Sequence, residues 1–295
     1  MTLPKISIVT PCFNAEKHLE STLRSVLDQG YPNLEYIVMD GGSNDATAQI
    51  LQRYASELHF WVSEKDAGQY DAINRGFTKA TGDVLCWLNA DDMLLPKSLF
   101  VVGEIFAQLP QVEWLSTLQP GSFDANGYLA RIAHLPGFSK AAFLDGLYLP
   151  TTAKKGYWLQ QESTFWRRSL WEKIGQQIPS YQLAGDFALW CKFYEHAQLY
   201  GVQYPLAGFR MIEGQRSEDI TLYMQEASAA LSQLRKESRW APAQTPAILY
   251  GSLSQIPLLK DWLRTKLGYQ GKLISNTMER SSDAKWRAST HSFLP

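Results

Sequence analysis

The sequence lacks the features typical of membrane-spanning, secreted and nucleic-acid-binding proteins. Its apolar runs are too short and too interrupted to cross a bilayer, and no basic and apolar leader precedes the first strand-like segment. The formal net charge is −1 and no long basic run occurs, so nucleic-acid binding has no electrostatic support. The three cysteines, Cys12, Cys86 and Cys191, are widely separated and lack metal-ligand spacing. We therefore expect free thiols in a reducing, cytoplasmic compartment.

What the chain does have is apolar content and a regular alternation of patterns. Hydrophobic residues make up 45% of the 295 residues, which is ample for a packed core. Strands are predicted at residues 6–10, 34–39, 59–63 and 84–88, and helices at 15–29, 45–56 and 70–80. This alternation is typical of an α/β fold with a Rossmann-like, mostly parallel sheet and helices on both faces.

The second half of the sequence is less regular. Further helices are predicted at residues 162–174, 186–196 and 217–239, and residues 281–295 have the pattern of a tail. Apolar and basic residues alternate irregularly in 258–267, which predicts a short amphipathic helix. Such a helix either rests on a membrane surface or packs on the rest of the protein with its lysines in solvent.

Polar clusters follow each of the four predicted strands, at residues 10–14, 40–45, 64–68 and 89–92. In parallel sheets of this kind, ligands bind beyond the carboxyl ends of the strands. We therefore expect the four clusters to form one site.

Several carboxylates at these positions have two interpretations. Asp91 and Asp92 are adjacent at a strand end, where a cation would relieve their repulsion, and oxygen ligands suit Mg²⁺ or Mn²⁺. Asp92 could equally cap the helix near Pro96. Asp186 is either a helix cap or a general base. The glycine turn at 40–45 is either an ordinary turn or a close approach to a ligand.

The order and spacing of five motifs make the chain resemble a known family. The motifs are ISIVTPCFN at 6–14, EYIVMDGGSND at 35–45, DAGQYDAINRG at 66–76, TGD leading into LNADD at 81–92, and AGDFALW at 184–190. The set resembles the GT-A fold, inverting glycosyltransferases of family 2, especially bacterial enzymes that build surface polysaccharides. The resemblance covers about residues 4–215. It implies a catalytic domain over 1–215, with a donor half (about 1–100) and an acceptor half (about 101–215), followed by a helical extension and tail over 216–295.

The resemblance also implies roles for individual residues. Asp186 matches the catalytic base of the family, and Asp91 and Asp92 match the element that holds a divalent metal, Mn²⁺ or Mg²⁺, on the diphosphate. The residues that it assigns to the nucleotide-sugar donor are Thr10, Pro11, Phe13, Asp40, Asp66, Gln69, Asn74, Asn89 and Asp91.

Acceptor residues are predicted by position only. Gln161, Glu162 and Trp190 follow the donor motifs and are the candidates. Trp158 and Trp166 can stack on a sugar face, but burial is an equal expectation for each.

Two positions depart from the family pattern. Asn89 stands where the first Asp of Asp-x-Asp is expected, so it can bond a ribose hydroxyl but brings no charge. Ile212 stands where many members carry the His of Arg-x-His, which puts a late metal or phosphate contact in doubt. The Gln-x-x-Arg-Trp element of processive synthases is absent from the sequence, which favours the transfer of one sugar per encounter.

The sequence thus predicts a metal-dependent glycosyltransferase that moves a sugar, with a UDP-sugar favoured as donor, onto a saccharide or lipid-linked saccharide. We expect it in the cytoplasm, with peripheral contact at the inner face of the plasma membrane left open. One alternative is a catalytically degenerate GT-A binding or scaffold protein, which Asn89 and Ile212 would favour. Another is a sugar nucleotidyltransferase, against which residues 10–18 count because they offer one lysine and no glycine for a triphosphate.

Overall fold

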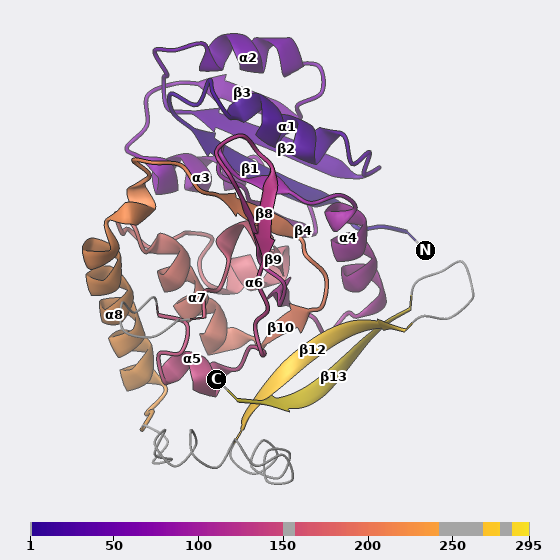
Figure 1. The fold of residues 1–295 in the computed structure, drawn as a ribbon, viewed down its shortest axis with the longest axis vertical. Coiled ribbons are helices and arrows are strands. Elements are labelled where there is room, and N and C mark those ends of the chain that lie inside the picture. Colours follow the sequence, from indigo (N-terminus) through magenta and orange to yellow (C-terminus); the bar gives the residue numbers. More distant parts are fainter. Residues whose placement is uncertain (1, 150–156, 242–267, 278–284, 295) are drawn as a thin grey trace.

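In the computed structural model of the protein, residues 2–149, 157–241, 268–277 and 285–294 are described (Figure 1). Strands and helices alternate over the first hundred residues, as predicted. The elements are β1 (Ile6–Cys12), α1 (Leu19–Leu27), β2 (Leu34–Asp40), α2 (Thr47–Tyr54), β3 (Phe60–Ser63), α3 (Gln69–Phe77), β4 (Val84–Trp87), β5 (Met93–Leu94) and α4 (Ser98–Gln108). The later elements are β6 (Trp114–Thr117), β7 (Gly121–Phe123), β8 (Leu129–Ile132), α5 (Lys140–Leu144), η1 (Gln161–Ser163), β9 (Phe165–Arg167), α6 (Arg168–Lys173), α7 (Gly185–His196), β10 (Leu199–Val202), β11 (Ala207–Arg210), η2 (Arg216–Glu218), α8 (Ile220–Glu237), β12 (Tyr269–Thr277) and β13 (Lys285–Phe293).

The described strands form one large sheet and one small sheet. The large sheet has nine strands in the order β13-β12-β10-β6-β9-β4-β1-β2-β3. Its pairs β4-β1, β1-β2 and β2-β3, and likewise β12-β10 and β10-β6, are parallel, and helices cover both faces (Figure 1). The predicted α/β class with a mostly parallel, Rossmann-like sheet is confirmed.

Burial explains why the N-terminal segments adopt these elements. Every residue of β1 is buried, as expected for a continuous apolar run inside a sheet that is covered on both faces. Helix α1 is amphipathic, and Leu19, Leu23 and Val26 lie on its buried side. The four expected polar clusters therefore follow strands whose ends are fixed by core packing.

The structure corrects the prediction of a single helix over residues 162–174. This segment contains the short helix η1, the strand β9 and the helix α6. Strand β9 runs antiparallel between β4 and β6 and so joins the two parallel parts of the sheet. Phe165 and Trp166 are fully buried there. A strand of three residues is too short to show an alternating pattern, so it could not be predicted from the sequence.

The C-terminal segment matches its prediction in one helix and differs from it in the last residues. Helix α8 forms within the predicted 217–239 segment, but the expected tail at 281–295 contains strand β13. Strand β13 pairs antiparallel with β12, which continues the large sheet beside β10. The indole of Trp286 on β13 is 7% exposed and donates to Glu104 of α4 at 2.9 Å. Residues 258–267, the predicted amphipathic helix, lie outside the described residues.

The small sheet has four strands in the order β5-β11-β7-β8, and it begins directly after the Asn89–Asp92 cluster. Strand β5 directly follows that cluster and pairs antiparallel with β11. Because β11 ends at Arg210, this pairing brings Arg210 next to Asp91 and Asp92.

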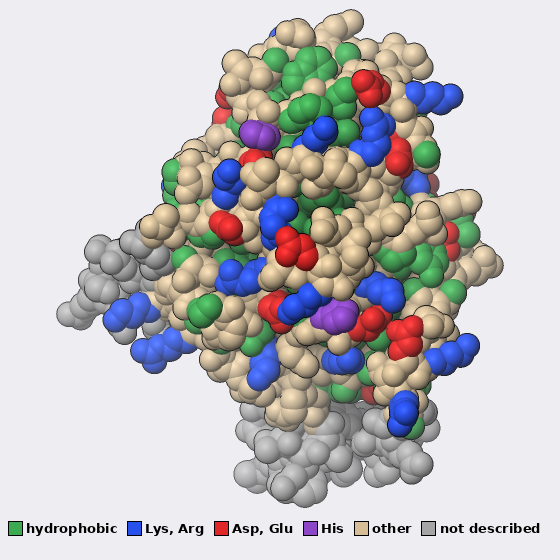
Figure 2. Space-filling model, turned by 180° about the vertical axis from the view of Figure 1, so that it is seen from behind, with side chains coloured by type: hydrophobic (Ala, Val, Ile, Leu, Met, Phe, Trp, Pro, Cys, Tyr) green, Lys and Arg blue, Asp and Glu red, His purple; other side chains and the backbone are tan. Residues whose placement is uncertain are grey.

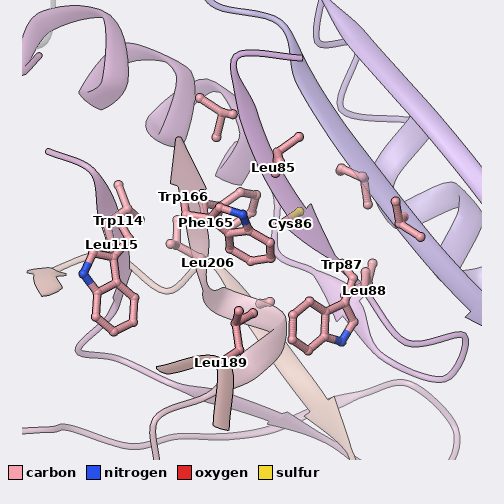
Figure 3. Close-up of a cluster of buried hydrophobic side chains, with 14 of the residues drawn as sticks. Leu85, Cys86, Trp87, Leu88, Trp114, Leu115, Phe165, Trp166, Leu189 and Leu206 are labelled. Carbon is pink, nitrogen blue, oxygen red and sulfur yellow. The ribbon is translucent and has the colours of Figure 1, made fainter. Parts of the chain in front are cut away.

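A group of aromatic side chains forms part of the core between β4, β6, β9 and α7 (Figure 3). The indole of Trp190 stacks on those of Trp87 and Trp114, with ring centroids 6.0 Å and 5.7 Å apart, and is 1% exposed. The assignment of Trp190 to the acceptor site is therefore corrected: it is a core residue. Trp166 is buried in the same group, whereas Trp158 is 38% exposed.

The surface carries charges of both signs. On the face shown in Figure 2, lysines and arginines are interspersed with aspartates and glutamates. No helix among the described residues is long and apolar enough to cross a membrane.

Candidate functional site

A cavity of about 740 Å³ opens at the carboxyl ends of β1 and β4, where the parallel strands were expected to present a site. Its volume is in the usual range for small-molecule pockets. Helix α3, helix α7, the segment after β11 and helix α8 supply its other walls. The polar clusters at the strand ends and the start of the Asp186 helix, which are far apart in the sequence, thus meet in one pocket.

The pocket brings together nine of the predicted site residues. They are Pro11, Phe13, Asp66, Gln69, Asn89, Asp91, Gln161, Glu162 and Asp186. Phe13 is 61% exposed and lies in the wall of the pocket as an uncovered aromatic ring.

Five predicted residues do not line the pocket: Thr10, Asp40, Asn74, Asp92 and Trp190. The Thr10 hydroxyl is buried and pairs with the Tyr36 hydroxyl at 3.1 Å. The Asp40 carboxylate accepts from the Ser63 hydroxyl at 2.5 Å and from the Ser43 hydroxyl. These two residues shape the strand ends behind the pocket.

Asn74 links two walls of the pocket from outside it. Its side chain on α3 accepts from the backbone N–H of Ile178 at 2.9 Å and donates to the Ile178 carbonyl at 3.3 Å. This pair of bonds ties α3 to the segment that leads into α7. Asn74 therefore positions neighbouring structure instead of facing the pocket.

Asn89 is a hydrogen-bond hub in the wall of the pocket. Its Nδ2 donates to Oδ2 of Asp92 at 3.1 Å and to Oε1 of Gln161 at 3.2 Å, while its Oδ1 accepts from Nε2 of Gln69 at 2.7 Å. A carboxylate at this position could not donate to Asp92 or Gln161. The amide therefore has a structural reason to stand where the family pattern has an aspartate.

Asp92 is fully buried behind the pocket. Its Oδ1 accepts from the backbone N–H of Arg210 at 2.9 Å, and Asn89 occupies its other oxygen. Burial, followed by the charges of Glu162 and Asp91, raises the pKa of Asp92 well above its usual range. Because both oxygens are engaged and the side chain is fully buried outside the pocket lining, Asp92 is not placed to bind a metal as predicted.

Asp91 is the partly exposed member of the carboxylate pair and faces the pocket. Its Oδ2 accepts from Nε2 of Gln215 at 3.0 Å, and its backbone carbonyl accepts from Nε of Arg210 at 2.6 Å. The described residues contain no group of three or more His, Cys, Asp or Glu side chains that could by themselves hold a metal ion. One pocket-facing carboxylate nevertheless fits Mg²⁺ or Mn²⁺, which commonly take most of their ligands from water and substrate phosphates.

Glu162 is a second buried carboxyl group in the pocket wall. It is 3% exposed, and its Oε1 has no hydrogen-bond partner among the described residues. Burial, together with the charges of Asp91 and Asp186 and against an opposing backbone hydrogen bond, raises the pKa of Glu162 to about 8. Near neutral pH the Glu162 carboxyl group therefore keeps its proton, which it can donate to a bound ligand.

Asp186 is in the first turn of α7. Its Oδ1 accepts from the backbone N–H of Phe187 at 2.7 Å, and the Tyr223 hydroxyl donates to its Oδ1 at 3.2 Å and lies 3.4 Å from its Oδ2. Burial raises the pKa of Asp186 to about 6, although both of these hydrogen bonds lower it. A carboxylate with such a pKa, open to a pocket, is suited to take a proton near neutral pH.

Sequence reasoning missed three residues of this site. Gln215 and Arg216 follow β11, where the family pattern focuses on position 212, and Tyr223 lies on α8, beyond the motifs. Arg216 Nη1 donates to Oε1 of Gln69 at 2.8 Å and so connects the segment after β11 to α3. The only available signal was the proximity of Gln215 and Arg216 to Ile212, which itself lines the pocket.

The comparisons with known proteins agree with this architecture. The protein is similar to the S. aureus TarS 1–349 structure in complex with UDP-GlcNAc, with a TM-score of 0.55 and 18% identity over 78% of this chain and 71% of that chain. This likeness shows the GT-A-type glycosyltransferase fold. The sequence model described as Glycosyl transferase family 2 matches residues 7–174. The protein belongs to glycosyltransferase family 2.

Two curated relatives are more similar in sequence. An uncharacterized glycosyltransferase of Mycobacterium tuberculosis is 31% identical over 184 residues, which cover 62% of this chain and 66% of the relative. The putative teichuronic acid biosynthesis glycosyltransferase TuaG of Bacillus subtilis is 37% identical over 92 residues, which cover 30% of this chain and 36% of TuaG. The alignments thus span less than two thirds of the length of either relative.

Proposed function

We propose that this protein is an inverting glycosyltransferase that moves a sugar from a nucleoside-diphosphate sugar to an acceptor hydroxyl. The observation that carries the proposal is the shared pocket of Asp91 and Asp186. One carboxylate can face the diphosphate through a cation, and the other can accept the proton of an attacking hydroxyl. The relative named for teichuronic acid biosynthesis supports a role in cell-surface polysaccharide or glycolipid assembly.

The residues of the pocket divide the chemical work. Phe13 and Pro11 offer an apolar wall for a nucleobase, and Asn89 and Gln69 offer amide groups beside it. Asp91 would hold Mn²⁺ or Mg²⁺ together with the diphosphate. When bound, the metal stabilises the negative charge that develops on the leaving group.

Asp186 would act as the general base. An acceptor hydroxyl has a high pKa, so its attack on the anomeric carbon needs a group that removes the proton as the bond forms. A single displacement, with the diphosphate leaving from the opposite side, inverts the anomeric configuration. The raised pKa of Asp186 brings it closer to the range in which proton transfer at neutral pH is efficient.

Calorimetric titration with UDP, GDP and dTDP, each with and without Mn²⁺, tests the donor site. We expect one nucleotide to bind tightly in the presence of Mn²⁺, with UDP favoured. Asp91→Ala should abolish the Mn²⁺-dependent part of the affinity. Asp28→Ala removes an exposed carboxylate that does not line the pocket and should change nothing.

Either of two results would contradict the proposal. Equal nucleotide affinity with and without Mn²⁺ in the unsubstituted protein would remove the metal from the mechanism. Absence of binding to all three nucleotides would favour a degenerate GT-A domain that keeps the fold without the activity.

A further inference from the structure

A partly exposed indole lines the same pocket as Asp186. Trp158 is 38% exposed, whereas Trp87, Trp114, Trp166 and Trp190 are each exposed by 1% or less. Trp158 is also part of the pocket wall, together with Asp186 and Glu162. Water contact of a large apolar ring in an open pocket is unfavourable unless a ligand covers it.

The position of Trp158 is fixed by a stacked partner. Its ring lies on that of Tyr223, with centroids 5.4 Å apart and planes inclined by 29°. Tyr223 is 8% exposed and holds Asp186 through its hydroxyl at 3.2 Å. The indole, the phenol and the carboxylate therefore form one connected unit, in which the aromatic surface and the base have a set relationship.

We propose that Trp158 is the platform on which the acceptor of this protein rests, and that the acceptor is a neutral sugar in its ring form. This inference rests on the proposed glycosyltransferase function. A pyranose has an apolar face of C–H groups and a rim of hydroxyls. The C–H face matches an aromatic surface, and a rim hydroxyl then lies toward Asp186 for deprotonation.

The charges around the platform argue for a neutral ring instead of a phosphate-bearing group. Asp186 is a carboxylate of the same wall, and near neutral pH its negative charge would repel a phosphate placed beside it. The unpartnered Oε1 of Glu162 can form a hydrogen bond with a rim hydroxyl, which both donates and accepts. An open-chain polyol has hydroxyls but no flat C–H face, so Trp158 would bind it less well.

Saturation-transfer NMR with methyl β-D-glucopyranoside and methyl β-D-galactopyranoside tests the platform on the unsubstituted protein. We expect the ring C–H protons of at least one glycoside to be saturated more strongly than its methyl group, and sorbitol at the same concentration to give no comparable signal. Equal signals from the glycosides and sorbitol would overturn the proposal, as would the absence of any glycoside signal.

Substitutions separate the platform from other aromatic surfaces. Trp158→Ala should weaken glycoside affinity about tenfold, and Trp158→Phe, which keeps a ring, should weaken it less. Tyr128→Ala is the control, because Tyr128 is a 74% exposed aromatic that does not line the pocket, and its removal should leave the signal intact. Retention of the full signal in Trp158→Ala, or its loss in Tyr128→Ala, would refute the assignment.

Nucleotide titration of the same preparations distinguishes the two proposals. Nucleotide binding without glycoside binding would overturn the platform and leave the donor site standing. Glycoside binding that depends on Trp158, without nucleotide binding, would support the platform as a sugar site and refute the proposed transferase.

Discussion

Replacing Asn89 by Asp would restore the acidic pattern of the family at the cost of stability. The change removes the Nδ2 donor from Asp92 and from Gln161. Leaving a buried acceptor without its hydrogen-bond donor costs about 1–3 kcal/mol, and this change leaves two such acceptors. We therefore expect the free energy of unfolding of Asn89→Asp to fall by about 3 kcal/mol at pH 8, a large part of a typical total.

The loss should depend on pH in a defined direction. The pKa of Asp92 is already raised by burial, Glu162 and Asp91, and a new carboxyl group at position 89 would raise it further. The folded variant then keeps protons that the unfolded chain releases above about pH 4. Its stability relative to the unsubstituted protein should therefore decrease as the pH rises from 5 to 8.

Urea unfolding at pH 5 and pH 8, followed by tryptophan fluorescence, measures both effects. Asn14→Asp is the matched control, because Asn14 is exposed and its Oδ1 accepts from the backbone N–H of Asn44, a role that a carboxylate keeps. It should change the unfolding free energy by less than about 0.5 kcal/mol. If Asn89→Asp were as stable as Asn14→Asp at pH 8, the donor role of Asn89 would be refuted.

Three further predictions concern the base and its supports. With the donor and acceptor identified, kcat/KM should rise with pH through about 6, the pKa of Asp186 in the free protein. Asp186→Asn should lower kcat at least about 100-fold. A kcat/KM profile that is flat between pH 5 and 8 would contradict the role of Asp186. Tyr223→Phe removes a hydrogen bond that lowers the pKa of Asp186, so the rise in kcat/KM should shift to higher pH, an effect that loss of packing alone would not produce. Gly185→Ala would place a Cβ 2.5 Å from the Tyr70 ring and should lower the free energy of unfolding by about 1–3 kcal/mol; unchanged urea unfolding would refute the tight fit.

The fold of the first hundred residues could be predicted well from the sequence because the signals there are local and repeated. Each buried strand is a continuous apolar run that ends at a polar cluster, and the parallel sheet then brings the clusters together. Phe13, Asn89 and Asp91 were placed in one site by this reasoning, and the structure puts all three in the pocket wall. The sequence did not show which of the two adjacent carboxylates, Asp91 or Asp92, faces the pocket. Whether Asp91 or Asp92 faces the pocket depends on the partner strand β11, which is more than a hundred residues away.

The structure after the first hundred residues depends on contacts that no local pattern encodes. Trp158, Trp166 and Trp190 are the same residue type, yet Trp166 and Trp190 lie in the core and Trp158 is exposed. Burial of Trp166 follows from the pairing of β9 within the large sheet, and burial of Trp190 follows from the packing of α7 against the same aromatic group. Neither element has enough residues or a clear enough period to reveal its buried side from the sequence.

Helix α8 is a structural part of the site, although the family motifs end before it. Besides Tyr223, it supplies Glu226, whose carboxylate accepts from the backbone N–H groups of Gln182, Leu183 and Ala184 at 2.8, 2.8 and 2.9 Å. These three bonds fix the segment that leads into α7 and therefore the place of Asp186. The position of Asp186 therefore depends on α8 as well as on the segment that carries the motifs.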